Sequence, residues 1–229
     1  MIGVIICSLG NVRVEWAMNM YRNQMSMGNA YQYILSTGKT VCDARNVGLT
    51  TGVERDYDKV MFWDDDVIPR EPEYAMQKLS VALDVYPEID VIGGIYPMKG
   101  NENMQLPIVE KEKDQPVWWG FEDGGLHQVY MTATGFTMFR MSSLRKLTGL
   151  MKYDIDGMTV TKYFDVDKDA RTDDFYFARM AKQQGLTWYV HGGVICDQVE
   201  LDGRLYKYEN SKPPEIQRAW LADKPLEKP

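Results

Sequence analysis

Hydrophobic and polar positions follow two different periods along the first hundred residues. Short apolar and β-branched runs, several of them closed by turn residues, predict strands. Between them apolar residues recur every three to four positions, as Val14, Met18, Tyr21 and Met25 do, and this spacing predicts helices. We expect strands at 2–7, 31–35, 60–63 and 89–95, and helices at 13–26, 41–54 and 73–85. This alternating order indicates an α/β protein with a mostly parallel central sheet and helices on both faces.

The second half of the chain is less regular. Gly, Pro and charged residues are mixed between 97 and 130, which favours a loop with short antiparallel strands. We expect, in order, a strand over 129–139 interrupted at Gly135, a helix from about 142, a helix over 172–184 capped by Thr172, and strands at 187–190 and 194–196. The length suits one domain, which we place at 1–211, followed by a Pro- and Lys-rich tail at 212–229.

Charge and cysteine content weigh against nucleic-acid binding and against a zinc site. The chain has 33 Asp and Glu against 26 Lys and Arg, a weak electrostatic basis for binding nucleic acid. Its three cysteines match no zinc-binding spacing and are expected to be reduced thiols. We see no secretion signal and no apolar run of the ~20 residues that span a bilayer. We therefore expect a soluble cytoplasmic protein, and a viral protein in a host cytoplasm would have the same features.

Three consecutive acids, Asp64, Asp65 and Asp66, follow a fully apolar strand. Neighbouring carboxylates at the end of a buried strand repel one another unless a cation or strong donors compensate them. Mg²⁺ and Mn²⁺ prefer carboxylate oxygen and leave positions open for phosphates, so metal-assisted chemistry on a phosphorylated substrate is the first hypothesis. The alternative is a polar turn whose acids only cap the next helix.

The predicted strands place other polar residues near these acids. Ser8 and Ser36 each follow a predicted strand, as the acids do. In open parallel sheets ligands bind at the carboxyl ends of the strands, so these residues are expected at one binding edge.

Five segments, in order, resemble glycosyltransferases of the GT-A fold, in particular the family 2-like enzymes that use nucleotide sugars. They are IGVIICS at 2–8, DARN at 43–46, VMFWDDDVIP at 60–69, TATGFTMFRMSSLRKL at 132–147 and TDDFYFARMAKQQGLTWYV at 172–190. The resemblance implies a Rossmann-like GT-A domain with a small antiparallel sheet. Its nucleotide-binding half would span about 1–100, and the half that binds donor sugar and acceptor about 101–211.

The resemblance also implies roles for the acids. Asp66 would bind Mn²⁺ or Mg²⁺, Asp64 would contact the ribose or a water on the metal, and Asp65 occupies the free position of the motif. In the segment at 172–190, Asp174 would be the base that takes the proton of the acceptor hydroxyl in an inverting transfer, with Asp173 in place of the usual glutamate. Helix N-terminal acids favoured by the helix dipole are the alternative for both.

The remaining nucleotide and sugar contacts are weaker predictions. Arg45 would approach the base or pyrophosphate, or else form a surface salt bridge with Asp43. Ser8 would contact the uracil or ribose, and Gly135 and Phe136 would line the donor sugar. Trp118 and Trp119 form either a stacking platform or part of the core.

The sequence departs from the family at the third metal ligand. Many relatives have a histidine after the last helix, where this chain has Gln198. Three outcomes are open for the third ligand of the metal: Asp197, His191 through a shifted loop, or else Gln198 or a water molecule.

The donor is expected to be a UDP-sugar on family grounds, and the acceptor a glycan, a protein or a modified nucleobase. Two alternatives stay open: a catalytically inactive nucleotide-sugar-binding module and a sugar nucleotidyltransferase.

Overall fold

The strands of the central sheet follow the segments that the hydrophobic pattern marks in the first half of the chain. The computed structural model describes residues 1–99, 108–110, 121, 123–166 and 172–207. Its strands are β1 Ile2–Ser8, β2 Tyr31–Thr37, β3 Lys59–Trp63, β4 Val67–Pro69, β5 Val91–Ile95, β6 Val109–Glu110, β7 Leu126–Val129, β8 Met131–Thr132, β9 Phe136–Arg140, β10 Lys152–Ile155, β11 Met158–Thr161, β12 Trp188–Val199 and β13 Leu205–Lys207. Its helices are α1 Val14–Met27, α2 Val41–Glu54, α3 Pro72–Val85, α4 Met141–Leu144 and α5 Asp173–Gln183.

The main sheet has the strand order β13-β12-β5-β9-β3-β1-β2, with β4 and β7 also paired to β12. Strand β1 runs parallel to β2 and β3, and β12 runs parallel to β5. Strand β9 is antiparallel to both β3 and β5 and lies between them. The predicted α/β class with a mostly parallel sheet is confirmed. Two small antiparallel sheets, β10-β11 and β6-β8, accompany it.

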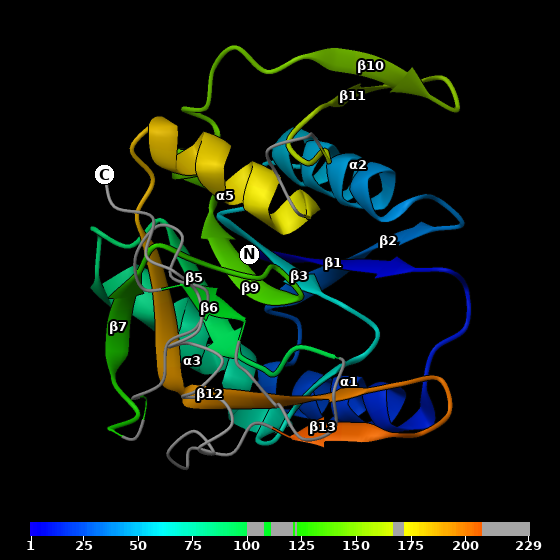
Figure 1. The fold of residues 1–229 in the computed structure, drawn as a ribbon, viewed down its shortest axis with the longest axis vertical. Coiled ribbons are helices and arrows are strands. Elements are labelled where there is room, and N and C mark those ends of the chain that lie inside the picture. The colour runs from blue at the N-terminus through cyan, green and yellow to red at the C-terminus, as the bar shows by residue number, and fades with distance from the viewer. Residues whose placement is uncertain (100–107, 111–120, 122, 167–171, 208–229) are drawn as a thin grey trace, which may run out of the picture.

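Helices cover both faces of the sheet. Helices α2 and α5 lie on one face and α1 and α3 on the other (Figure 1). The buried side chains of β3 divide accordingly, because side chains alternate along a strand. Val60 and Phe62 join the core beneath α2 and α5, whereas Met61 and Trp63 join the core beneath α1 and α3. The strand that precedes the acids is thus buried on both sides, as its all-apolar sequence predicts.

The structure corrects the expectations for the second half. Residues 129–139 are divided among β7, β8 and β9, and the interruption expected at Gly135 is confirmed, since β9 begins at Phe136. The carbonyl of Gly135 continues the pairing of β9 with β3, whereas its N–H bonds to a side chain. Its carbonyl accepts from the Asp64 N–H at 2.8 Å, and its N–H donates to the Tyr96 hydroxyl at 2.7 Å. The strands expected at 187–190 and 194–196 are one strand, β12, with an irregularity in its pairing to β5 after Val190.

Some expectations fall outside the described residues. These are the roles of Trp118 and Trp119 and the structure of the tail at 212–229. All three cysteines are free thiols, with Cys196 buried and the other two partly buried. In the part of the chain that the structure describes, no helix has the length and hydrophobicity needed to cross a bilayer.

Candidate active site

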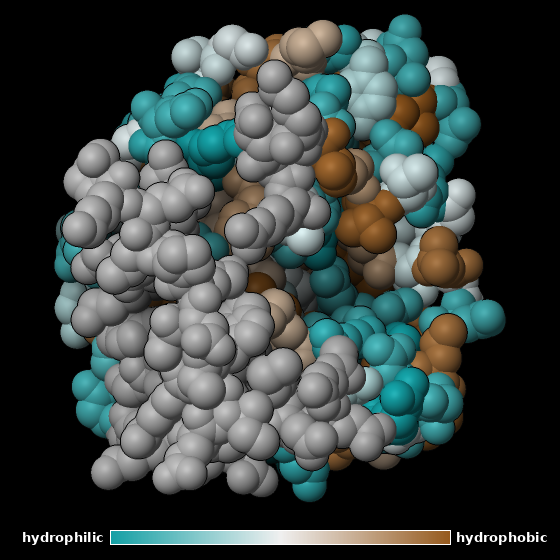
Figure 2. All heavy atoms as spheres, in the orientation of Figure 1, coloured by the Kyte–Doolittle hydropathy of each residue, from teal (hydrophilic) through white to brown (hydrophobic). Residues whose placement is uncertain are grey.

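The three consecutive acids lie at the carboxyl end of β3, beside the carboxyl end of β1. A cavity of about 300 Å³ opens there, and Asp64, Asp65, Asp66 and Ser8 all line it. Leu9 and Leu201 line the same cavity and are largely exposed, so its wall is partly apolar. Hydrophobic side chains also interrupt the polar surface on the right of the face drawn in Figure 2. The structure therefore brings the acids and Ser8 together, at the edge where an open α/β sheet binds ligands.

Arg45 of α2 connects the acids of β3 to those of α5. Its guanidinium donates to Asp64 Oδ2 at 2.8 Å, to Asp173 Oδ2 at 2.5 Å and to Asp174 Oδ1 at 2.7 Å. The side chain of Arg45 is only 5% exposed, and it lies over the rings of Phe62 and Phe164. The alternative of a surface salt bridge with Asp43 is wrong, because Arg45 is buried and pairs with other acids.

Burial and charge act against each other in this cluster. Burial alone would lower the pKa of Arg45, but Asp174, Asp64 and Asp173 outweigh it and hold that pKa well above its usual range. Burial raises the pKa of Asp64 above its ordinary value despite the opposing charge of Arg45, and neighbouring carboxylates add to the increase. Burial is also the main cause of the raised pKa of Asp173. A single cation thus partly neutralises three acids that come from distant parts of the chain.

Thr134, in the segment before β9, holds Asp174 of α5 in place with two hydrogen bonds. Thr134 donates to Asp174 Oδ1 through its hydroxyl and, at 3.2 Å, through its backbone N–H. At the next residue, a Cβ on Gly135 would lie 2.8 Å from both Asp64 Oδ2 and the Tyr96 hydroxyl oxygen. A side chain at this position would displace Asp64 or Tyr96, so glycine allows Asp64 to keep its present position.

The other two acids of the run have their own cationic partners. Arg13 donates to the Asp65 carbonyl oxygen at 2.9 Å and to its carboxylate at 3.3 Å. Lys99 donates to Asp66 Oδ2. Lys99, Thr134 and Tyr96 were missed by the sequence reasoning. Thr134 lies inside the segment TATGF, whose glycine was noticed, whereas no pattern marks Lys99 or Tyr96.

Gln198 lies beside the acidic run, as its position in the sequence led us to expect. In the pairing of β12 with β4, Gln198 is opposite Val67, and the N–H of Val199 donates to the Asp66 carbonyl at 2.9 Å. The side chain is buried, and among the described residues its Oε1 atom has no hydrogen-bond donor. An unpaired buried acceptor next to Asp66 is compatible with a cation or a bound donor.

The two other candidate ligands are directed elsewhere. Asp197 accepts from Arg70 at 2.7 and 2.9 Å. His191 lines a different cavity, and its Nδ1 atom accepts from the Gly193 N–H at 3.1 Å. Within the described ranges, no three His, Cys, Asp or Glu side chains are arranged to hold a metal ion. Among the predicted ligands, Asp64 and Asp66 line the cavity with carboxylate oxygens, the type that Mn²⁺ and Mg²⁺ prefer, whereas Gln198 is buried and not part of that lining.

Two further residues of the resembling segments have structural positions. Phe136 is fully buried and packs edge-to-face on Trp63, with the ring centroids 5.3 Å apart. The structure therefore does not bring Phe136 to the cavity at the acids. Asn46 of the DARN segment is buried and bonds to the backbone at Tyr163 and Phe164. These two positions therefore support the acid cluster from within the core.

Comparisons with known proteins establish the fold. No protein-family profile matches the chain, and no curated protein matches its sequence. The crystal structure of A197 from STIV matches with a TM-score of 0.62 at 20% identity, over 91% of this chain and 94% of that one. The structure of apo-UDP-glucose pyrophosphorylase matches with a TM-score of 0.42 at 10% identity, over 86% of this chain and 75% of that one. The first match establishes a shared fold, and the second is too weak to support an inference.

Proposed function

We propose that this protein is a metal-dependent glycosyltransferase that moves a sugar from a nucleoside diphosphate sugar, expected to be a UDP-sugar, to an acceptor hydroxyl. The observation that carries the proposal is the contact of Arg45 with both Asp64 and Asp174. The acids after β3 and the acids of α5 were predicted for two different roles in one reaction. Because one guanidinium donates to both Asp64 and Asp174, the two groups of acids are neighbours, which supports their action on one bound substrate.

In the proposed reaction the acceptor oxygen attacks the anomeric carbon as the bond from that carbon to the diphosphate oxygen breaks. Asp174 takes the proton of the acceptor hydroxyl, and the nucleoside diphosphate leaves with the bonding electron pair. Thr134 holds Asp174 in position by hydrogen bonding to its Oδ1 atom. An inverted anomeric configuration is the expected outcome, since in a single displacement the acceptor oxygen attacks the face opposite the leaving diphosphate.

Asp66 and Asp64 would hold the Mn²⁺ or Mg²⁺ ion, which supplies Lewis-acid neutralisation of the leaving diphosphate. Asp66 and Lys99 are paired in the structure described here, so Lys99 would move from Asp66 to a phosphate oxygen when substrate enters. Asp65 and Ser8, which line the cavity, would contact the nucleoside.

The first test is calorimetric titration of UDP with and without Mn²⁺. The wild type is expected to bind UDP only with metal, and Asp66→Ala to lose that binding. Asp84→Ala, at an exposed acid of α3, is the matched control and should bind as the wild type does. Absence of binding by UDP, GDP and other nucleoside diphosphates would remove the main support for the proposal.

The second test assigns the base. Hydrolysis of UDP-sugars with Mn²⁺, and transfer once an acceptor is found, are expected to fall by about 10²–10⁴ in Asp174→Asn. The neighbouring Asp173→Asn variant shares the contact with Arg45 and should lose less. Equal losses in the two variants, with UDP binding retained, would contradict the assignment of Asp174 as base.

One observation favours the alternative of an inactive nucleotide-sugar-binding module. Arg45 and Lys99 already compensate Asp64 and Asp66, so the acids are accommodated without an ion. Such a module would bind UDP without metal and show no hydrolysis of any UDP-sugar in the same experiments.

A further inference from the structure

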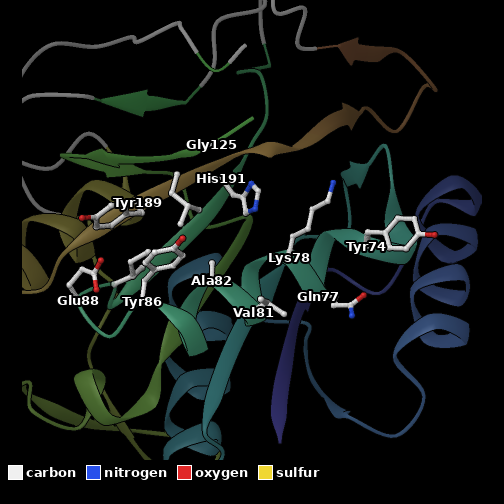
Figure 3. A pocket seen from close by; sticks show the side chains of 12 residues that line it. Tyr74, Gln77, Lys78, Val81, Ala82, Tyr86, Glu88, Gly125, Tyr189 and His191 are labelled. Carbon is white, nitrogen blue, oxygen red and sulfur yellow. The ribbon is translucent and has the colours of Figure 1, made fainter. Parts of the chain in front are cut away.

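A second cavity, of about 710 Å³, lies between α3 and the first half of β12. It shares no lining residue with the cavity at the acids. Figure 3 shows Tyr86 and Tyr189 near Glu88 at one end, His191 in the middle, and Tyr74 and Gln77 at the other end. The cavity is thus an elongated groove with aromatic side chains at both ends, and nothing in the proposed transfer reaction uses it.

The polar groups of the groove are available to a ligand. Among the described residues, no hydrogen bond is made by the hydroxyls of Tyr74, Tyr86 and Tyr189 or by the side chains of Gln77 and Glu88. The Gly193 N–H donates to His191 Nδ1, so the neutral imidazole carries its proton on Nε2, which can donate to a ligand. Donors and acceptors are therefore spread along the whole groove.

The groove has little net charge. Lys78, the ammonium at its edge, pairs with Glu71 at 2.7 Å and donates to the Gly193 carbonyl at 2.9 Å. Burial, with a smaller contribution from Lys78, lowers the pKa of His191, so this ring is neutral at pH 7. An anionic ligand would gain little electrostatic attraction here, because Lys78 is already paired and Glu88 is the other ionisable side chain of the lining apart from the tyrosines and His191.

Volume and chemistry together select the ligand. Small-molecule sites occupy about 300–1,000 Å³, whereas a stable protein partner needs an interface of more than about 1,000 Å². Pyranose rings present C–H faces that pack on aromatic rings and hydroxyls that donate and accept at their edges. A neutral chain of sugars therefore matches the length, aromatic ends and unpaired polar groups of this groove.

We propose that the groove between α3 and β12 is a second carbohydrate-binding site, which holds a neutral oligosaccharide on the rings of Tyr86, Tyr189 and Tyr74 with hydrogen bonds to His191 Nε2, Gln77 and Glu88. The site is separate from the acids and does not depend on the proposed transfer reaction.

Calorimetric titration with maltohexaose, cellohexaose, xylohexaose and chitohexaose tests the proposal. At least one of these probes should bind the wild type, and its affinity should fall about tenfold in Tyr86→Ala and in Tyr189→Ala, which corresponds to about 1.4 kcal/mol. Tyr21→Ala, at an exposed tyrosine of α1, is the matched control and should bind unchanged. Asp66→Ala should also bind unchanged, which separates this site from the transfer site.

The proposal is overturned if no probe binds, or if the groove variants bind as tightly as the control while remaining folded by urea denaturation. It is equally overturned if light scattering shows a dimer that Tyr86→Ala dissociates, because a second copy of the chain would then occupy the groove.

Discussion

At the scale of single residues, the decisive side chain is Arg45, which is buried and contacts three carboxylates from two distant segments. A buried ion pair is costly to form but still more costly to break, since removing one partner leaves the other charge uncompensated. Arg45 is therefore needed for the folded state whatever chemistry the acids perform. Its role in positioning Asp64 and Asp174 follows from the same contacts.

Replacing Arg45 by methionine should destabilise the protein by about 3–5 kcal/mol near pH 8. The effect should be smaller near pH 5. Burial already raises the folded-state pKa of Asp64 above its unfolded value, and loss of Arg45 raises it further. At a pH above that raised pKa, the charged carboxylate of Asp64 lowers the stability of the folded state. As the pH falls, protonation of Asp64 removes this loss of stability. Urea denaturation at the two pH values measures the difference.

Arg145→Met is the control for this experiment. Arg145 pairs with Asp56, which is largely exposed, so its loss should cost under about 1 kcal/mol at either pH. A loss in Arg45→Met that is equally small, or that grows as the pH falls, would contradict the view of Arg45 as the buried counter-ion of these acids.

Sequence alone predicted residues whose chemistry is visible in one short segment. The acids at 64–66 and at Asp173 and Asp174 were found because neighbouring carboxylates are conspicuous in a pattern. The partners of those acids could not be found in this way, since Lys99 and Tyr96 are ordinary residues that become relevant only through the fold. The displacement of His191 from the acids likewise depends on the path of β12.

At the scale of elements, α2 is fixed to the chain between β11 and α5 by one amide side chain. Asn46 Oδ1 accepts from the N–H groups of Tyr163 and Phe164 at 2.9 and 2.7 Å, and Asn46 Nδ2 donates to the Phe164 carbonyl at 2.8 Å. These bonds satisfy backbone groups of a segment that belongs to no helix or strand. Phe164 in turn stacks on Phe177 of α5 with ring centroids 4.7 Å apart, so these bonds link α2, and with it Arg45, to α5.

Asn46→Ala should therefore cost about 2–4 kcal/mol of unfolding free energy, because it leaves two N–H groups and a carbonyl buried without partners. Asn29→Ala, at an exposed position after α1, should change stability by less than about 0.5 kcal/mol. Urea denaturation of both variants measures these losses. If Asn46→Ala unfolds at the same urea concentration as the wild type, water replaces the amide with little loss of unfolding free energy.

Helices and strands were predicted best where the hydrophobic period is local and sustained. The expected helix at 41–54 coincides with α2, and the expected helix at 172–184 differs from α5 by one residue at each end. The hairpin β10-β11 was missed, and in residues 129–139 the interruption at Gly135 was predicted but the separation of β7 from β8 was not. These two features depend on strand pairing and on backbone hydrogen bonds to distant side chains. The spacing of hydrophobic residues along the sequence carries no information about either.

At the scale of the whole molecule, the fold protects its three thiols. Burial, with a smaller contribution from Asp64, raises the pKa of Cys7 to about 12, and burial, with Asp173, raises that of Cys42 to about 11. Cys196 is fully buried. Since the thiolate is the reactive form, the folded protein at pH 8 holds its cysteines almost entirely in the unreactive form.

A thiol-specific disulfide reagent at pH 8 should therefore label the native protein far more slowly than a free thiol. After denaturation in guanidinium it should label all 3 cysteines. A cysteine that reacts at the free-thiol rate in the folded protein would contradict the packing around β1, α2 or β12. Protection of labelling by UDP would report on Cys7, which lines the cavity at the acids.

Strand β9 is synthesised after β5, yet it separates β5 from β3 in the sheet. In a nascent chain that has left the ribosome only as far as β5, the facing edges of β3 and β5 are therefore unsatisfied and do not pair with each other in the native state, and the other edge of β5 awaits the later strand β12. The two facing edges close together when residues 136–140 insert between them. Such distant pairing is slow to form, so the incomplete chain is exposed to wrong strand pairing during translation, and folding of the sheet is expected to finish only after its middle strand has emerged.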